Sequence, residues 1–313
     1  MYCKLDSGSC NLSPNREAAI RNPIRTSVRK PGYVFLSWVL AQCAVLTFLA
    51  PLAASAAELR PEAAQGYDQY IRLTELRMQG ELPPGGVFLW IDRLPEAQSR
   101  ELHARLERGE IVSERLETSD PSGHSATPGA LVHHWVGTVF IPGVKLAQVL
   151  TVTQDYDRHS EYYKPDVMQS KKVAQMGDEF KVHYRLRKKR IITIVLDADY
   201  DVHRYFLNPT QAYSHSVAVR VAQVENAGQP SEHDLPPGKD GGYMWRLNSY
   251  WRYFDTGNGV YVQCEAVSMT RDIPAGLSWL VGSFVQSVPR ESLDFTLRST
   301  RAAVLHVAAS APH

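Results

Sequence analysis

The sequence predicts an α+β fold: a curved antiparallel sheet that grips a long C-terminal helix, with a small helical N-terminal lead-in. Two observations predict it. Strand-like runs follow one another through the middle of the 313-residue chain, with helical patterns before and after them. Near the end, the aromatic and β-branched runs 242–253 and 260–269 flank Gly257-Asn258-Gly259, a typical hairpin turn, and an apolar helix follows directly.

The composition is that of an ordinary globular protein. The net charge is +1 and charged residues make up 21%, so nothing indicates nucleic-acid binding, while a hydrophobic content of 44% is enough for a core. Of the four cysteines, only Cys264 follows the expected leader, so the mature chain has no internal disulfide. We expect Cys264 to be a buried small hydrophobic residue rather than a nucleophile.

The N-terminus has the anatomy of a bacterial secretory signal peptide. Residues 33–50 form an apolar run that basic residues precede, and the small-x-small motif Ala54-Ser55-Ala56 follows. We therefore expect 1–56 to be a leader that is cleaved near Ala56, which gives a periplasmic or secreted protein.

Two alternatives stay open for this leader. The apolar run 33–50 approaches the ~18–20 residues of a membrane span, so it can instead anchor the chain in the inner membrane. Residues 1–27 lack the pattern of a signal-peptide start, and translation from Val28 would give a short basic one.

After the leader, residues 57–118 read as the helical lead-in. Helical spacing runs over 62–79, an extended segment over 87–91, and a second helix over 95–106 that Gly109 ends. A loop rich in Ser, Pro and Gly follows and is taken as a linker. The expected domain plan is a linker at 119–130, the main domain at 131–305 and a tail at 306–313.

The main domain begins with a strand at 131–141 and a helix that buries one side at 149–163. A polar loop with three prolines fills 227–241. Between them lies a meander of β-branched and aromatic runs at 167–174, 180–186, 191–196, 200–206 and 213–224.

The closing hairpin has an expected register, because an even-length loop pairs odd residues of its first strand with even residues of its second. One face then carries Trp245, Leu247, Ser249, Trp251, Val262, Cys264 and Ala266, and is suited to receive a helix or to enclose a cavity. The other face carries Arg246, Asn248, Tyr250, Arg252, Gln263 and Glu265, and is expected to be solvated and charge-paired.

The closing helix places Leu277, Leu280 and Phe284 on one apolar face. Pro289 lies inside its pattern and predicts a kink or break at 285–288, because proline removes a backbone donor and clashes with the preceding turn. Two interpretations remain: the first half lifts as a lid, or the bend is fixed and follows the sheet.

The stretch 154–167, with Asp155-Tyr156 and later Tyr163-Lys164-Pro165, resembles the first helix and second strand of the START-like superfamily. The closing hairpin and helix also resemble it, so the likeness covers 131–303. This superfamily includes StAR-related lipid-transfer domains, polyketide cyclases and coenzyme Q-binding proteins. The resemblance implies a helix-grip fold around an apolar cavity, and it carries fold better than activity.

The expected function is binding or carriage of a hydrophobic small molecule or lipid in that cavity, in the cell envelope, without cofactor or nucleic acid. The alternative is a cyclase- or aromatase-type enzyme, which needs an Asp, His or Arg on the cavity face. That face of the hairpin offers only Ser249 and Cys264 as polar groups, which favours binding. A structural or partner-binding envelope protein is a third possibility. The residues expected to line the cavity are Tyr184, Trp245, Leu247, Ser249, Trp251, Val262, Cys264, Ala266, Leu280 and Phe284.

Few residues carry a chemical signal. Asp155 and His159 lie four apart and can form an acid–base couple or two metal ligands, but no third ligand fits a metal signature. His159 falls on an apolar stripe, which favours a satisfied histidine. The histidines at 133, 134, 203 and 215 are interpreted as structural.

The strongest charge run is 185–190. Its basic residues are expected either to solvate a hairpin edge or to contact an anionic membrane surface. They are Arg185, Arg187, Lys188, Lys189 and Arg190.

Overall fold

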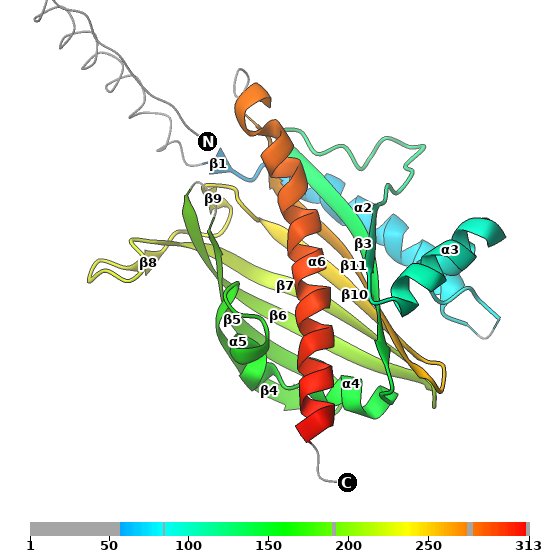
Figure 1. The fold of residues 1–313 in the computed structure, drawn as a ribbon. Coiled ribbons are helices and arrows are strands. Elements are labelled where there is room, and N and C mark those ends of the chain that lie inside the picture. The colour runs from blue at the N-terminus through cyan, green and yellow to red at the C-terminus, as the bar shows by residue number, and fades with distance from the viewer. Residues whose placement is uncertain (1–56, 84, 190–191, 274–277, 311–313) are drawn as a thin grey trace, which may run out of the picture. The chain divides into compact units, whose positions relative to one another are not determined.

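A curved antiparallel sheet is the centre of the computed structural model, which describes residues 57–83, 85–189, 192–273 and 278–310, with the backbone alone for 278–286 (Figure 1). These residues belong to the unit Ser55–His313. The predictions on the leader, its cleavage site and its apolar run lie outside the described residues. Within the described part, no helix is both long and apolar enough to cross a membrane.

The sheet has one continuous antiparallel path, in the order β2-β3-β11-β10-β7-β6-β5-β4. Two short pairs lie beside it: β8 (His233–Asp234) on β7, and β1 (Ala57–Glu58) on β9 (Lys239–Asp240). The strands of the path are β2 (Ile111–Arg115), β3 (Ala130–Pro142), β4 (Val167–Met176), β5 (Glu179–Lys189), β6 (Thr193–Asn208), β7 (Gln211–Glu225), β10 (Arg246–Asp255) and β11 (Gly259–Arg271).

The closing hairpin has the predicted register. Trp251 pairs with Cys264 and Arg252 with Gln263, so odd residues of β10 face the same way as even residues of β11. The turn is tight because Gly257 adopts a φ of 87°, where residues with a Cβ are strained.

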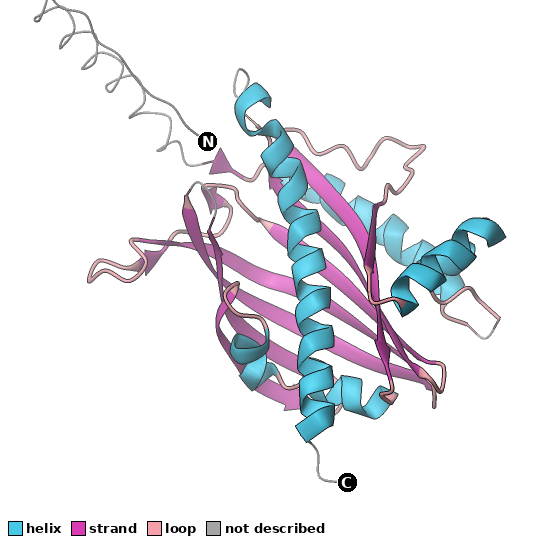
Figure 2. Ribbon diagram, in the orientation of Figure 1, coloured by secondary structure: helices cyan, strands magenta, loops and turns pink. Residues whose placement is uncertain are grey.

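Helix α6 (Ser278–Ser310) lies along one face of the sheet, and the sheet curves around it (Figure 2). We call this the inner face. Gly137 on β3 permits the close approach, since a Cβ there would lie 2.7 Å from Cδ1 of Leu297. The fold is thus the helix-grip arrangement that the sequence predicted.

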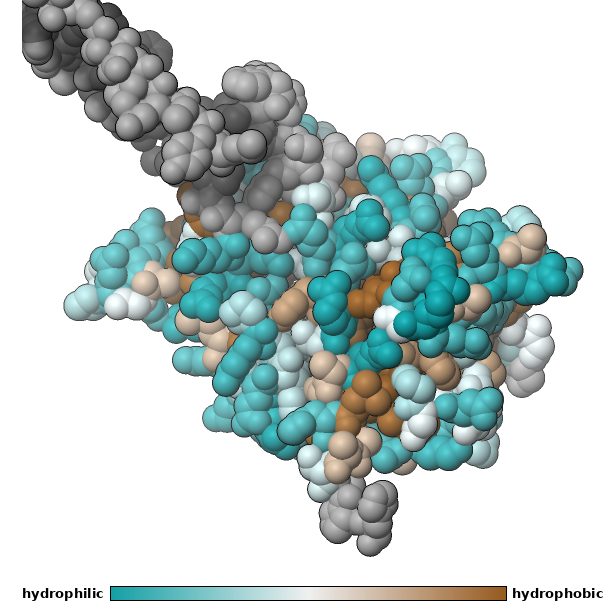
Figure 3. Space-filling model, in the orientation of Figure 1, coloured by the Kyte–Doolittle hydropathy of each residue, from teal (hydrophilic) through white to brown (hydrophobic). Residues whose placement is uncertain are grey.

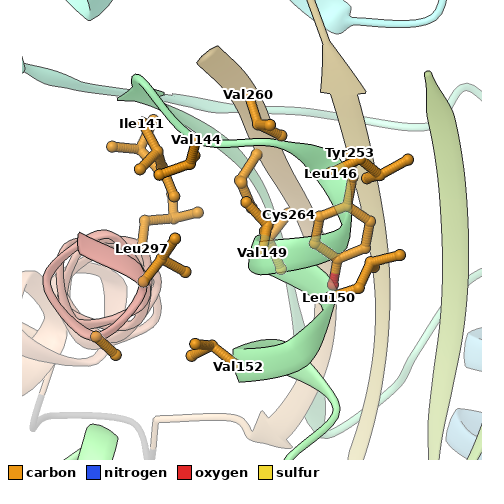
Figure 4. Close-up of a cluster of buried hydrophobic side chains, with 14 of the residues drawn as sticks. Ile141, Val144, Leu146, Val149, Leu150, Val152, Tyr253, Val260, Cys264 and Leu297 are labelled. Carbon is orange, nitrogen blue, oxygen red and sulfur yellow. The ribbon is translucent and has the colours of Figure 1, made fainter. Parts of the chain in front are cut away.

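Beside the C-terminal end of α6, helix α4 (Leu146–Thr153) closes one end of the inner face and completes the largest core cluster (Figure 4). Val149 of α4, Val262 of β11 and Leu297 of α6 are all fully buried there. Burial of each such side chain contributes about 1.5–3 kcal/mol, so this cluster is what fixes α6 on the sheet.

The opposite, outer face is covered by the helical lead-in. Helix α2 (Pro61–Glu81) begins with proline at its first position, which suits a helix N-terminus. Its buried residues Tyr67, Ile71, Thr74 and Met78 recur at helical spacing and pack on the sheet. The 3₁₀ helix η2 (Trp90–Arg93) and helix α3 (Glu96–Glu107) extend this cover.

The outer face of the hairpin is therefore buried, and the expectation that it is solvated is wrong. Tyr250 and Glu265 are fully buried and Arg252 is 1% exposed. Helix α2 supplies partners for these polar groups: Glu75 accepts from Tyr250 Oη at 2.9 Å, and Glu81 accepts from Arg252. Tyr67 of α2 also donates to the backbone oxygen of Val267 at 2.7 Å. A charged residue is tolerated here because it is paired.

Several element boundaries differ from the sequence expectations. Residues 87–91 form no strand but lead into η2, and β2 was not expected. The expected helix 149–163 is split into α4, the 3₁₀ turn η3 (Tyr156–Arg158) and α5 (His159–Tyr162), while β6 joins two expected strands. Helix α6 continues through Pro289, so the predicted break is wrong, and a kink at 285–288 stays a prediction.

Candidate functional site

The inner face is packed unevenly along its length. Beside α4, Val262 and Cys264 are buried in the core cluster. Farther along the same strands the inner side chains are only half-buried, although α6 runs along this face. They are Trp135, Leu247, Ser249, Trp251 and Ala266. Trp135, Trp251 and Ala266 pack against the edge of the core cluster, and Arg290 of α6 lies 5.8 Å over the Trp135 ring, so this part of the face is covered less tightly than the end beside α4.

Most of the predicted site residues share this face. Val262 and Cys264 belong to its packed end, and Leu280 and Phe284 have side chains outside the described residues. Those brought together on the inner face are Tyr184, Leu247, Ser249, Trp251, Val262, Cys264 and Ala266.

Trp245 is not part of it. It packs with Tyr67, Val267 and Met269 on the outer side, and its Nε1 donates to Oδ1 of Asp240 at 3.0 Å. The prediction failed because Trp245 precedes β10, so the alternation of the strand does not extend to it.

A histidine and a tyrosine are hydrogen-bonded on this face. His159, at the start of α5, has its Nδ1 2.7 Å from Oη of Tyr184 on β5, and the rings stack with centroids 5.8 Å apart. Its Nε2 lies 3.3 Å from the carbonyl oxygen of Val152. Burial lowers the pKa of His159 to about 4, so the ring is neutral at neutral pH. The interpretation of His159 as a satisfied histidine is confirmed.

Asp155 does not join His159, so the acid–base couple is not formed. Its Oδ2 instead accepts a hydrogen bond from Oη of Tyr162 at 3.0 Å. Among the described residues, no group of three or more His, Cys, Asp or Glu side chains is placed to hold a metal ion.

Further buried tyrosines stand around Tyr184, and the sequence analysis did not select them. Tyr200 on β6 meets Tyr184 edge-on, with ring centroids 5.5 Å apart. Tyr163 bonds to Oγ1 of Thr300 on α6 at 3.0 Å. Burial raises the pKa of Tyr200 and of Tyr184. Strand parity was the signal that was missed, since Tyr184 and Tyr200 occupy inner positions of neighbouring strands.

Two residues of the basic run have acidic partners. Arg185 donates to Asp197 at 3.0 Å and to Glu232 at 2.6 Å, and Lys188 donates to Asp166 at 2.7 Å. Arg187 and Lys189 complete the described part of the run, and Arg190 lies outside the described residues.

Two grooves are formed by described residues, one on the outer side of the sheet and one at its β2 edge, beside α6. One, of about 340 Å³, lies between α2 and β7, with Tyr67, Val219 and Arg246 in its wall. The other, of about 290 Å³, has Trp90 and Arg290 in its wall. Figure 3 shows the α6 side of the molecule, which is largely hydrophilic with hydrophobic residues gathered near the course of α6.

No family model matches the chain, and no curated protein matches its sequence. Solved structures do resemble it. A STAR-related lipid transfer protein from Xanthomonas axonopodis is 17% identical, covers 62% of this chain and 98% of its own, and has a TM-score of 0.40. Human STARD10 is 11% identical, covers 69% of this chain and 82% of its own, and has a TM-score of 0.39. The Zhui aromatase/cyclase from a Streptomyces species is 10% identical, covers 57% of this chain and 98% of its own, and has a TM-score of 0.37.

At these identities and TM-scores the likeness says nothing about activity. The element order and the curved sheet around α6 are by themselves those of a START-like, helix-grip fold. The fold and superfamily resemblance predicted from the sequence are thus confirmed. Because this fold hosts unrelated functions, function has to be argued from the inner face.

Proposed function

We propose that the protein binds or carries a hydrophobic small molecule or lipid on the inner face, beneath α6. The observation that carries this proposal is the half-burial of Trp135, Ser249 and Trp251 between the sheet and the helix. Ligand sites are lined mainly by apolar and aromatic side chains with a few polar groups, and this part of the face has that composition.

The test is whether the full-length protein retains an apolar molecule. Protein purified without detergent is analysed by native mass spectrometry for co-purifying lipids, and its affinity for the neutral fluorophore N-phenyl-1-naphthylamine is measured. We expect a bound lipid or saturable binding of the fluorophore. Absence of both would contradict the proposal.

A matched pair of variants locates the binding. Ser249→Phe adds bulk to the inner face, whereas Val219→Phe adds the same ring to the outer face, where Val219 is 57% exposed. We expect the first to weaken fluorophore binding at least tenfold and the second to leave it unchanged, with both variants folded by circular dichroism. Equal effects would place the binding elsewhere.

An enzymatic role is the alternative, and His159 is one acid–base group that the inner face offers it. A histidine with a pKa of about 4 is a weak base at neutral pH, and both its nitrogens already have partners. These observations favour binding over catalysis.

Location and membrane contact belong to the same proposal. The leader 1–56 supports export to the cell envelope, and sequencing the exported protein should find an N-terminus near Ala57. A peripheral contact with anionic membranes through the run 185–190 would rest on Arg187 and Lys189, since Arg185 and Lys188 have acidic partners. Vesicle co-sedimentation of the double variant R187Q/K189Q tests it, and unchanged binding would contradict it.

A further inference from the structure

The groove of about 340 Å³ on the outer side of the sheet lies where β7 and β10 separate. The last pair between these strands is Asn248 with Val217. Beyond it, β10 extends only to Arg246, whereas β7 continues to Glu225 beside β6. Helix α2 forms the other wall of the opening. The volume is at the lower end of the ~300–1,000 Å³ range of small-molecule sites, so the groove can take a small organic molecule.

A β-bulge shapes one wall of this groove. The register of β7 against β6 shifts at Val219, which opposes no residue of β6. A bulge bends its strand and re-aims the side chain of the extra residue. Val219 is 57% exposed, and it lies in the groove wall together with Val217 of β7 and Ile71 of α2. These three side chains give the groove an apolar surface.

The groove wall also carries two opposite charges, the guanidinium of Arg246 on β10 and the carboxylate of Asp68 on α2. Within the described part of the chain, neither forms an ion pair. By contrast, Asp197 and Asp201 on neighbouring β6 are both paired with basic residues. The two charges of the groove are therefore available to a ligand that carries the complementary pair.

Asn248 and Tyr67 add polar groups to the same groove. The Oδ1 of Asn248 accepts from Tyr67 Oη at 3.1 Å, and its Nδ2 lies 3.4 Å from Nε2 of His215. An amide nitrogen has two protons, which leaves one N–H that can donate to a ligand. Burial raises the pKa of Tyr67, while the charge of Arg246 lowers it and that of Asp68 raises it, so both charges lie near this hydroxyl.

We propose that this groove is a second binding site, for a zwitterion of amino-acid size with an apolar side chain. The ligand carboxylate accepts hydrogen bonds from the Arg246 guanidinium, whose N–H groups match it in geometry. The ligand ammonium pairs with Asp68, and the apolar side chain packs on Ile71 and Val219. A ligand with a single charge satisfies only one of the two groups. The site is separate from the inner face and does not rest on the proposed function.

The experiment measures the binding of three compounds to the full-length protein by ligand-observed NMR titration at neutral pH and low salt. They are L-phenylalanine, 3-phenylpropanoate, which lacks the ammonium, and phenethylamine, which lacks the carboxylate. We expect saturable binding of L-phenylalanine and at least tenfold weaker binding of each analogue, because each lacks one charge-assisted hydrogen bond. Equal affinities for the three compounds, or no binding of L-phenylalanine, would overturn the proposal.

Variants that remove one charge assign the two roles. Arg246→Gln should weaken L-phenylalanine binding at least tenfold without weakening that of phenethylamine, which has no carboxylate. Asp68→Asn should weaken L-phenylalanine binding to a similar extent without weakening that of 3-phenylpropanoate. Arg100→Gln and Glu96→Gln, which change an exposed ion pair on α3, are the controls and should have no effect. Groove variants that acted no differently from these controls would overturn the assignment.

Added bulk separates this site from the inner face. Val219→Phe narrows the groove, so it should weaken L-phenylalanine binding at least tenfold and leave the binding of N-phenyl-1-naphthylamine unchanged. Ser249→Phe should have the opposite effects. If the fluorophore does not bind but L-phenylalanine does, the proposed function fails and the groove site stands. If Ser249→Phe weakens L-phenylalanine binding as much as Val219→Phe does, the amino acid binds on the inner face and the groove site is overturned.

Discussion

Arg252 on β10 and Glu81 at the end of α2 form an ion pair, with Nη2 and Oε2 2.6 Å apart, although both side chains are almost fully buried. Arg252 also donates to the carbonyl oxygen of Phe88 at 2.6 Å. Glu81 accepts in addition from Arg77 and Arg93. This pair joins the helical lead-in to the outer face of the sheet. Because both groups are buried, water cannot take the place of either partner if it is removed.

The first prediction is that breaking this pair destabilises the fold. Arg252→Met leaves the Glu81 carboxylate buried with one charge partner fewer, so we expect a loss of about 3–5 kcal/mol in the free energy of unfolding. Urea denaturation measures it. Arg100→Met is the control, because its pair with Glu96 is exposed and should contribute almost nothing. A loss for Arg252→Met as small as the control's would show that the lead-in is not held by this pair.

The second prediction concerns the closest approach of α6 to the sheet. The Cβ of Gly137→Ala would lie 2.7 Å from Leu297 Cδ1 and 3.2 Å from Leu293 Cδ2, so α6 must shift. We expect a loss of about 1–3 kcal/mol in thermal or urea unfolding.

Gly80→Ala is the matched control for this change. Gly80 lies in α2 and a Cβ there meets nothing within 4 Å. Alanine is the better helix former by about 1 kcal/mol, so this variant should be stabilised. If both alanines acted in the same direction, the contact between Gly137 and α6 would not be what limits the packing.

The third prediction is that Cys264 is unreactive in the native protein. Its side chain is 3% exposed, and burial raises the pKa of its thiol, so little thiolate forms. Alkylation followed by peptide mass spectrometry should find Cys264 unmodified in the native state and rapidly modified in denaturant. Fast native labelling would mean that the inner face opens at its packed end.

The hairpin shows which structural features could be predicted from the sequence and which could not. Its parity follows from the turn at Gly257, and the pairing of Trp251 with Cys264 confirms it. Sequence alternation does not say what covers each face, however. The face with Arg252 and Glu265 was expected to be solvated, and it is buried because α2, some 170 residues earlier in the chain, brings Glu81 and Tyr67 to it.

The candidate site was also predictable only in part. Strand parity places Ser249 and Trp251 on the inner face, but the bond between His159 and Tyr184 joins a helix to a strand 25 residues away. No local pattern encodes such a contact, because it depends on how α5 docks on the sheet. Trp245 marks the opposite failure, in which a local pattern was extended beyond the end of its strand.

The last prediction is that stability falls as the pH drops from about 6.5 to 4. His159 has a pKa of about 4 in the fold, mainly because burial disfavours its charge, whereas an unfolded histidine titrates near ~6.5. In this window the unfolded chain binds a proton that the native state does not, so unfolding is favoured as the pH falls. The contribution of His159 is up to about 3 kcal/mol and ends below pH ~4, where both states are protonated.

His133 titrates in the same direction, so the test compares wild type with His159→Leu. The difference between their unfolding free energies should be constant above pH ~7 and should shrink towards pH ~4. A difference that stayed constant throughout would mean that His159 has the same pKa in the native and the unfolded state.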